Sequence, residues 1–263
     1  MHTFENFKHS FLKNGKPIFV PNEFGEELGR KLKRKVAKAY KFDPFIYHFK
    51  DGSHVKALHL HRKNSFFCRV DIEKFFYGIR RNRVKRALKE INIPKPEYYA
   101  KWSTVKNPYD SGGYVVPYGF VQSPILATLV LALSPVGIFL RGLPETITPS
   151  VYMDDICLSS QDKDALSRAF DGLLEAMEAG NFTINADKTR EPATVIDIFN
   201  CSLENDVTAV LPERVDEFFA VDREPASAEA FETYCDIVKS HTWRVGRKRK
   251  RRRLVRVAAK AEA

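Results

Sequence analysis

The chain has 263 residues, of which 44% are hydrophobic, so it can bury the core of a compact globular protein and is not a disordered or fibrous chain. Its net charge is +10, and residues 244–263 supply +9 of it because they contain ten Lys or Arg and one Glu. No apolar run reaches about eighteen residues and no basic-then-apolar leader opens the chain, which favours a cytoplasmic protein without a membrane span. The four cysteines form no Cys-x-x-Cys pair, so neither a zinc site nor a disulfide framework is indicated.

The first elements predicted along the chain are a helix over residues 23–40, a hairpin turn over residues 50–53 and a strand over residues 55–60. The helix is amphipathic and carries a basic patch, which we expect to face the phosphate backbone of a nucleic-acid duplex. The candidate nucleic-acid ligands on this helix are Arg30, Lys31 and Arg34.

The next predicted strand, residues 66–70, is followed directly by an acid, Asp71. A carboxylate at the end of a strand can meet other acids at the same edge of a sheet, although Asp71 could instead cap the helix that follows. Farther along, we predict a helix over residues 82–90, a loop-rich stretch over residues 94–113 and a buried helix over residues 125–133 that has proline in its first turn.

The segment Tyr152-Met153-Asp154-Asp155 lies between two short apolar or β-prone runs, which predicts a hairpin with both carboxylates at its tip. Adjacent carboxylates repel each other, so such a pair persists mainly where a divalent cation neutralises it. Together with Asp71, the pair predicts a three-acid site for two Mg²⁺ ions about 4 Å apart, the arrangement used for in-line displacement at a phosphoryl group. The alternative is a solvated turn without a metal.

The last predicted elements are an amphipathic helix over residues 162–179 and a strand over residues 195–200. A strand, a helix, a hairpin, a helix and a strand in this order predict an α+β fold, in which an antiparallel sheet is backed by helices on one face.

Four motifs, in this order, resemble palm motifs A to D of the reverse transcriptases: Asp71-x-x-x-Phe75-Phe76, Pro117-Tyr118-Gly119-Phe120-Val121-Gln122-Ser123-Pro124, Tyr152-Met153-Asp154-Asp155 and Asn185-Ala186-Asp187-Lys188-Thr189. The second motif looks most similar to that of bacterial reverse transcriptases of the unknown and defence-associated groups. The resemblance implies a right-hand polymerase with fingers in residues 1–65, a palm in residues 66–200 with a finger insertion at about residues 94–116, and a reduced thumb with a basic tail in residues 201–263.

The resemblance also implies roles for individual residues. The catalytic residues would be Asp71, Asp154, Asp155 and Lys188, and the metal site would comprise Asp71, Ile72, Asp154 and Asp155. Lys188 would protonate the pyrophosphate leaving group, the alternative being a plain phosphate contact or a solvated loop lysine. Phe76 would exclude a 2′-hydroxyl by steric overlap, the alternative being a core aromatic. The residues assigned to the incoming deoxynucleotide are Phe76, Gln122, Tyr152, Lys56, Arg62 and Arg69.

Two further regions are assigned to nucleic acid. Gly119 would let the backbone approach the nascent base pair closely. The C-terminal tail would bind phosphates as an arm or as the end of a thumb helix, the alternative being a solubilising or membrane-surface tail. The basic residues of this tail are Arg247, Lys248, Arg249, Lys250, Arg251, Arg252 and Arg253.

In function, the resemblance implies an RNA-directed DNA polymerase that adds dNTPs to a 3′ hydroxyl or a protein hydroxyl, with two Mg²⁺ or Mn²⁺ ions as cofactors. The expected partners are an RNA template or a dedicated non-coding RNA, the DNA product, and a partner protein or a second copy of the chain, in antiphage defence. One alternative is template-independent or protein-primed DNA synthesis by the same fold. The other is a catalytically silent RNA-binding scaffold.

Overall fold

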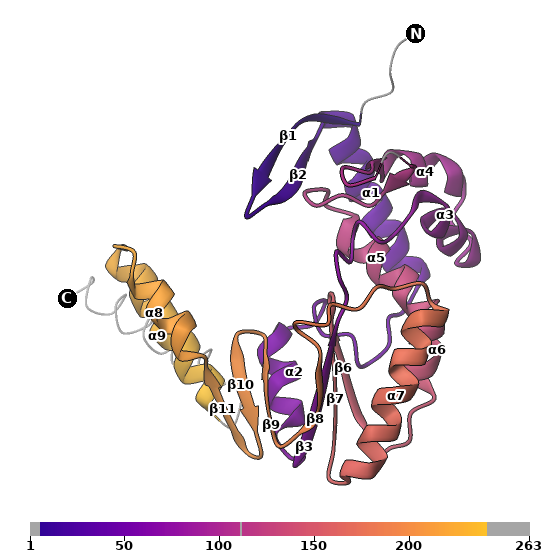
Figure 1. The fold of residues 1–263 in the computed structure, drawn as a ribbon. Helices are drawn as coiled ribbons and strands as arrows, with labels where there is room; N and C mark the ends of the chain where they lie inside the picture. Colours follow the sequence, from indigo (N-terminus) through magenta and orange to yellow (C-terminus); the bar gives the residue numbers. More distant parts are fainter. Residues whose placement is uncertain (1–5, 111, 241–263) are drawn as a thin grey trace, which may run out of the picture. The chain divides into compact units, whose positions relative to one another are not determined.

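The computed structural model describes residues 6–110 and 112–240 (Figure 1). The chain divides into two compact units, which are described separately here. Unit 1 comprises residues 1–44, 72–143 and 172–185, and unit 2 comprises residues 45–71, 144–171 and 186–263.

Unit 1 combines an antiparallel hairpin with several helices. Its elements are β1 (Phe7–Lys13), β2 (Lys16–Pro21), α1 (Glu23–Ala39), α3 (Arg81–Glu90), α4 (Pro96–Trp102), β4 (Val105–Lys106), β5 (Tyr114–Val115), α5 (Ser123–Ala132) and α6 (Pro135–Arg141). The Asn22 side chain caps α1 by accepting a hydrogen bond from the Gly25 backbone N–H at 2.7 Å. The helices predicted over residues 23–40, 82–90 and 125–133 are therefore confirmed as α1, α3 and α5.

Unit 2 contains the antiparallel sheet that the sequence predicts, and this sheet has four strands in the order β6-β7-β3-β8. Its strands are β3 (Phe66–Asp71), β6 (Thr148–Tyr152), β7 (Asp155–Ser160) and β8 (Arg190–Ala193). The helix α7 (Lys163–Ala179) follows β7, and the Asp162 carboxylate caps it by accepting from the backbone N–H groups of Asp164 and Ala165. The first part of α7 belongs to unit 2 and the rest to unit 1.

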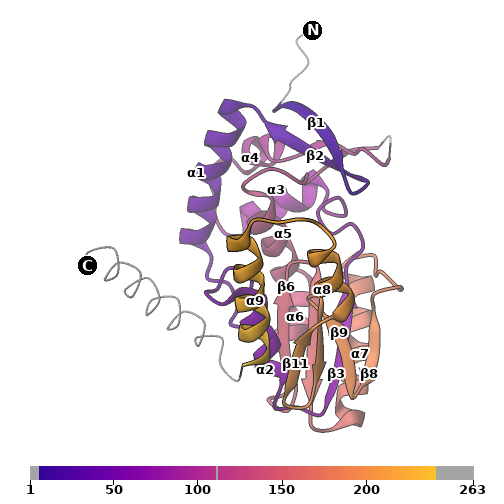
Figure 2. The same ribbon diagram turned by 90° about the vertical axis from the view of Figure 1, so that its left-hand side faces the viewer.

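The C-terminal part of unit 2 is a second antiparallel sheet followed by two helices that lie side by side (Figures 1 and 2). The elements are β9 (Val195–Ile198), β10 (Cys201–Glu204), β11 (Val207–Val210), α8 (Pro212–Phe219) and α9 (Pro225–Lys239). The rings of Phe218 and Phe231 stack at 3.9 Å between the two helices. Buried residues of both sheets, of α2 and of α9 form one apolar core, which includes Leu58, Phe67 and Ile198.

Two predictions about local structure are wrong. Residues 55–60 are not a strand but part of α2 (Ser53–His61), because the buried side chains Val55, Leu58 and His61 recur at helical rather than strand spacing. The turn before them leads into this helix and not into a hairpin, with Gly52 at the N-cap in the left-handed region (φ 86°). The stretch predicted as loop-rich also contains α4, which Pro96 starts in its first turn.

Within the described residues, no single helix is long and apolar enough to cross a membrane. The helices α5 and α6 reach that length and composition only as a pair bent by 67°.

A buried histidine joins the strands of the β6–β7 hairpin to α2. His61 is fully buried, and its two ring nitrogens form hydrogen bonds of 2.7 Å with Ser150 Oγ on β6 and Ser159 Oγ on β7. In the neutral ring one nitrogen donates and the other accepts, and each serine hydroxyl can take the complementary role. Burial lowers the pKa of His61 from 6.5 to about 3. His61 therefore fixes the hairpin whose tip carries the candidate catalytic acids.

We expect the stability of unit 2 to fall as the pH drops below about 6.5, because the unfolded His61 then takes up a proton that the folded ring accepts only near pH 3. At pH 5 this linkage lowers the free energy of unfolding by roughly 2 kcal/mol relative to neutral pH. Urea unfolding at pH 7.5 and pH 5 measures the loss. The matched variant is His61→Gln, which keeps a donor and an acceptor but does not titrate. An equal loss in the two proteins would contradict this role.

Candidate active site

The Tyr152–Asp155 segment forms the tip of the β6–β7 hairpin, as predicted. Tyr152 pairs with Asp155 across the two strands, and Met153 adopts the left-handed conformation (φ 59°) that closes the turn. The Met153 backbone N–H donates to Nδ1 of His48 at 3.2 Å. Burial lowers the pKa of His48 to about 4, so this ring is neutral at physiological pH and can accept the bond. No sequence pattern had indicated His48.

Asp71 and Asp155 face each other because β3 and β7 pair with these two residues directly opposite. Asp71 is 3% exposed, and Asp155 is also largely shielded from solvent. Burial is the main cause that raises the pKa of Asp155 to about 6, and the neighbouring Asp154 and Asp71 raise it further while Arg69 opposes them. The sequence thus places three acids at one edge of the sheet, where their charges need a cation.

That cation is Arg69, which lies two residues before Asp71 on the same face of β3. Its Nη2 atom is 2.5 Å from Asp155 Oδ1 and 3.4 Å from Asp71 Oδ2, and its Nε donates to the same Asp155 oxygen at 2.7 Å. The sequence assigned Arg69 to the triphosphate, but the structure pairs it with the acids. A second cation, Lys188, places Nζ 3.7 Å from Asp71 Oδ2 and is half exposed.

The part of the chain that the structure describes holds no group of three His, Cys, Asp or Glu side chains arranged to bind a metal ion. The predicted three-acid metal site is therefore not preformed, because the Arg69 guanidinium bridges two of its carboxylates. The side chains are nevertheless chemically suited to a divalent ion, because Mg²⁺ prefers carboxylate oxygens as ligands. The bridge formed by Arg69 also shows that one cationic group can join Asp71 to Asp155.

The other residues of unit 2 assigned to the nucleotide have different surroundings. Tyr152 is half-buried, and its ring lies edge-on to Phe199 at 5.4 Å and to His48 at 5.9 Å. Lys56 lies on α2. The prediction that Arg62 holds the triphosphate is corrected, because this side chain is 5% exposed and donates to the Val238, Lys239 and Ser240 carbonyls at the end of α9. Arg62 thereby satisfies a helix C-terminus.

In unit 1, Phe76 and Gln122 point into the interior. Phe76 is 5% exposed and packs against Tyr118 at 4.7 Å between ring centroids, as the core-aromatic alternative expects. Gln122 is 1% exposed and donates to Ser103 Oγ at 3.3 Å, so its placement gives no support to a contact with template or substrate. The steric role of Phe76 stays a prediction.

Gly119 is required by a close backbone approach, but the partner is β2. It has φ +102°, and a Cβ at this position would lie 2.1 Å from the Phe19 carbonyl oxygen. The neighbouring Tyr118 carbonyl accepts a hydrogen bond from the Phe19 backbone N–H at 2.9 Å. The glycine is thus explained within unit 1, without the base pair that the sequence suggested.

The basic candidates divide between α1 and the tail. Arg30, Lys31 and Arg34 are exposed on α1, where Arg30 pairs with Glu26 at 2.6 Å. The tail residues 247–253 lie outside the described residues.

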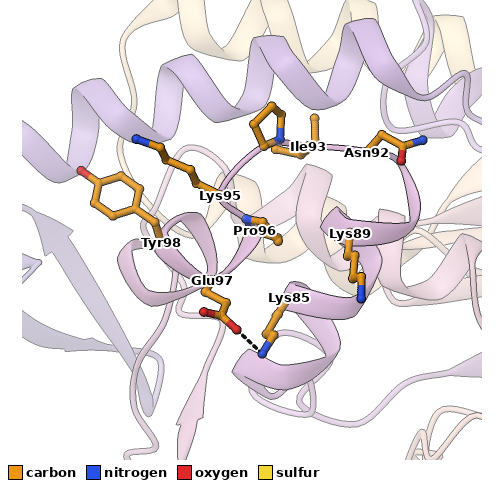
Figure 3. Close-up of a pocket in the computed structure, with 9 residues that line it drawn as sticks. Lys85, Lys89, Asn92, Ile93, Lys95, Pro96, Glu97 and Tyr98 are labelled. Carbon is orange, nitrogen blue, oxygen red and sulfur yellow. Dashed lines mark ion pairs between the residues drawn. The ribbon is translucent and has the colours of Figure 1, made fainter.

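Unit 1 also contains a hollow of about 710 Å³ between α3 and α4, shown in Figure 3. Its lining includes three lysines, Lys85, Lys89 and Lys95, and none of the predicted catalytic acids.

Comparisons with known proteins agree on one family. The sequence model of the family described as reverse transcriptase (RNA-dependent DNA polymerase) matches residues 8–198. Among solved structures, apo telomerase from Candida Tropicalis, truncated from its C-terminal domain, matches with a TM-score of 0.52 and 16% identity over 76% of this chain and 53% of that chain. This likeness shows the fold alone and confirms the predicted polymerase-type architecture.

Two structures of the foamy viral protease-reverse transcriptase, one in complex with double-stranded DNA and one with an RNA/DNA hybrid, match at 15% identity with TM-scores of 0.49 and 0.44. They cover 82% and 64% of this chain but 32% and 20% of their own chains. The chain therefore spans about half or less of the length of these three structures. The search of curated protein sequences gave no match.

Proposed function

This chain belongs to the reverse transcriptase family, and from that premise we propose that it synthesises DNA on an RNA template by adding dNTPs to a 3′ hydroxyl or a protein hydroxyl. The observation that carries the proposal is the pairing of Asp71 with Asp155, which brings two strand-end carboxylates together beside Asp154 at the hairpin tip. Phosphoryl transfer by metal ions requires converging acids of this kind, and shielded carboxylates that lie close together are typical of functional sites.

Enzymes of this family generally use divalent metal ions. In our proposal the Asp71, Asp154 and Asp155 carboxylates would hold two Mg²⁺ or Mn²⁺ ions, together with Ile72, which follows Asp71 in the chain. When bound, such ions supply the charge that activates the attacking hydroxyl and stabilises the leaving pyrophosphate. Lys188 lies beside Asp71 and is half exposed, so its ammonium group can reach a phosphate and donate a proton to the leaving group.

The proposed nucleotide site also selects the sugar through Phe76. We expect Phe76→Val to raise the use of ribonucleotides relative to deoxynucleotides by about tenfold or more, because the smaller side chain leaves space for a 2′-hydroxyl. The matched control is Phe75→Val, which shortens an equally buried neighbour (1% exposed). The measurement is the ratio of kcat/KM for dGTP and GTP. A wild type that already uses both equally well would rule out steric selection.

We further propose that the enzyme acts in the cytoplasm as a bacterial defence-type reverse transcriptase, with a dedicated non-coding RNA and with a partner protein or a second copy of the chain. The four cysteines, which are all free thiols, support a reducing compartment.

Sequencing of the products made with each dNTP, with and without co-purified RNA, tests the proposed function. Products complementary to the RNA are expected. Products of one repeated nucleotide that form without RNA would instead show template-independent synthesis, and products attached to protein would show protein priming. RNA binding without any DNA product would support the alternative of a catalytically silent RNA-binding scaffold.

A further inference from the structure

We propose that Arg69 is an internal counter-cation that exchanges partners when substrate binds: its guanidinium leaves Asp71 and Asp155 for the triphosphate, and thereby couples nucleotide binding to metal binding. This inference rests on the proposed polymerase function. It concerns a residue that positions the catalytic acids and controls their access to the metal.

The contacts of Arg69 show that it occupies the place of a bridging cation. Its side chain is 14% exposed and contacts Asp155 Oδ1 through Nη2 and Nε and Asp71 Oδ2 through Nη2. Its third nitrogen, Nη1, donates to the Asp197 carbonyl of β9 at 3.0 Å, which holds the fork in place. All these groups belong to unit 2.

A metal ion and this guanidinium compete, since both need the same carboxylate oxygens and both are positive. A free ion must displace Arg69 from two carboxylates without offering it a new anion, which leaves a largely buried charge without its partners. A metal-bound triphosphate offers phosphate oxygens in return, and a planar guanidinium binds these in the same bidentate way as a carboxylate. Binding of the two together therefore costs less than binding of the metal alone.

The experiment measures Mn²⁺ binding by electron paramagnetic resonance on the full chain, with and without dATP and without primer. We expect Arg69→Gln to bind free Mn²⁺ about tenfold more tightly than the wild type and to lose about tenfold in affinity for Mn²⁺-dATP. The matched control is Arg190→Gln, which removes a guanidinium from the facing position of β8, where its hydrogen bonds within the described residues go to the Asp187 and Thr189 carbonyls. It should change neither affinity.

Unchanged or weaker binding of free Mn²⁺ by Arg69→Gln would overturn the exchange, and would mean that Arg69 only orders the acids. If this variant does not fold, Arg69→Lys is the alternative, because it keeps the positive charge but loses the bidentate guanidinium. It should show smaller changes in the same two affinities, for free Mn²⁺ and for Mn²⁺-dATP. If the wild type polymerises but Arg69→Gln binds free Mn²⁺ and Mn²⁺-dATP as the wild type does, the exchange by Arg69 is refuted and the proposed function is not. A wild type that binds Mn²⁺-dATP but makes no product from any primer or RNA refutes the proposed function instead.

A second observation, independent of the first, is the basic hollow of unit 1. From it we infer a binding site for the phosphates of an RNA segment. Figure 3 shows Lys85 and Lys89 on α3 and Lys95 before α4, with the Tyr98 ring at the rim. Lys85 is paired with Glu97, which leaves the charges of Lys89 and Lys95 in excess. Both are exposed, and Tyr98 is 40% exposed, which suits stacking of a base or sugar.

The turn that carries Lys95 is held in an unusual conformation. Asn92 and Lys95 both have positive φ, 58° and 59°, although neither is glycine. Backbone bonds fix this turn, from Asn92 N–H to the Lys89 carbonyl at 3.0 Å and from Ile93 N–H to the Leu88 carbonyl at 2.9 Å. At Asn92 this is the usual left-handed ending of a helix, here α3, in which backbone N–H groups bond back to the last turn. Lys95 is therefore presented by a fixed turn.

Fluorescence anisotropy of a labelled RNA, from about 50 to 300 mM salt, tests the site. The double variant Lys89→Gln with Lys95→Gln should flatten the slope of log affinity against log salt by about 1.4, since each phosphate contact on a single strand contributes about 0.7. The control changes two exposed lysines of the same unit outside the hollow, Lys101 and Lys106, to Gln. Equal slopes for the two double variants would overturn the site. Loss of dATP binding with unchanged RNA binding would also overturn it, since the ligand would then be a free nucleotide.

Discussion

Replacement of Asp71 or Asp154 by Asn is expected to lower dNTP incorporation by at least about 1,000-fold, which corresponds to roughly 4 kcal/mol of lost transition-state stabilisation. Each change removes one carboxylate charge but almost no volume, so the metal site that we propose loses a ligand while the fold stays intact. Incorporation of a labelled dNTP on a primed RNA measures the effect. Circular dichroism and RNA affinity should match those of the wild type.

The control for these variants is Glu204→Gln, which neutralises an exposed carboxylate on β10 in the same unit. It should retain full activity. Near wild-type synthesis by both Asp71→Asn and Asp154→Asn would end the assignment of this hairpin as the catalytic centre, whatever the fold.

The second large effect is expected from Gly119→Ala, which should destabilise unit 1 by about 3 kcal/mol or more. The added Cβ would lie 2.1 Å from the Phe19 carbonyl oxygen, and alanine also disfavours a φ of +102°. Gly113→Ala separates the two causes, because Gly113 has a similar φ of +95° but no atom within 4 Å of the added Cβ. The control should therefore lose only about 1 kcal/mol.

Urea unfolding gives the two free energies, and hydrogen exchange of β2 locates the loss. If Gly119→Ala were as stable as the wild type but bound primed template poorly, the glycine would serve the nucleic acid, as the sequence suggested. Equal destabilisation by the two substitutions would instead show that the contact with Phe19 costs nothing.

Elements whose patterns are local could be predicted from the amino-acid sequence. The periodicity of residues 162–179, the cap at Asp162 and the apolar runs around the Asp154-Asp155 pair are set by near neighbours in the chain, so α7 and the β6–β7 hairpin could be predicted. The position of Asp71 directly after a strand-forming run likewise predicted its meeting with the hairpin, which the β3–β7 register confirms.

Features that depend on contacts between residues far apart in the chain could not be predicted from the sequence. Residues 55–60 were predicted as a strand, and packing of their apolar side chains against the core of unit 2 makes them a helix. The polar groups of Arg62 and Gln122 can bind a ligand or form internal hydrogen bonds. The sequence did not show that Arg62 is buried against α9 and Gln122 against Ser103. The bridge from Arg69 to Asp155 joins residues 86 positions apart. The sequence shows which polar and charged side chains the protein has. The partners of a buried charge depend on which distant segments pack around it in the tertiary structure.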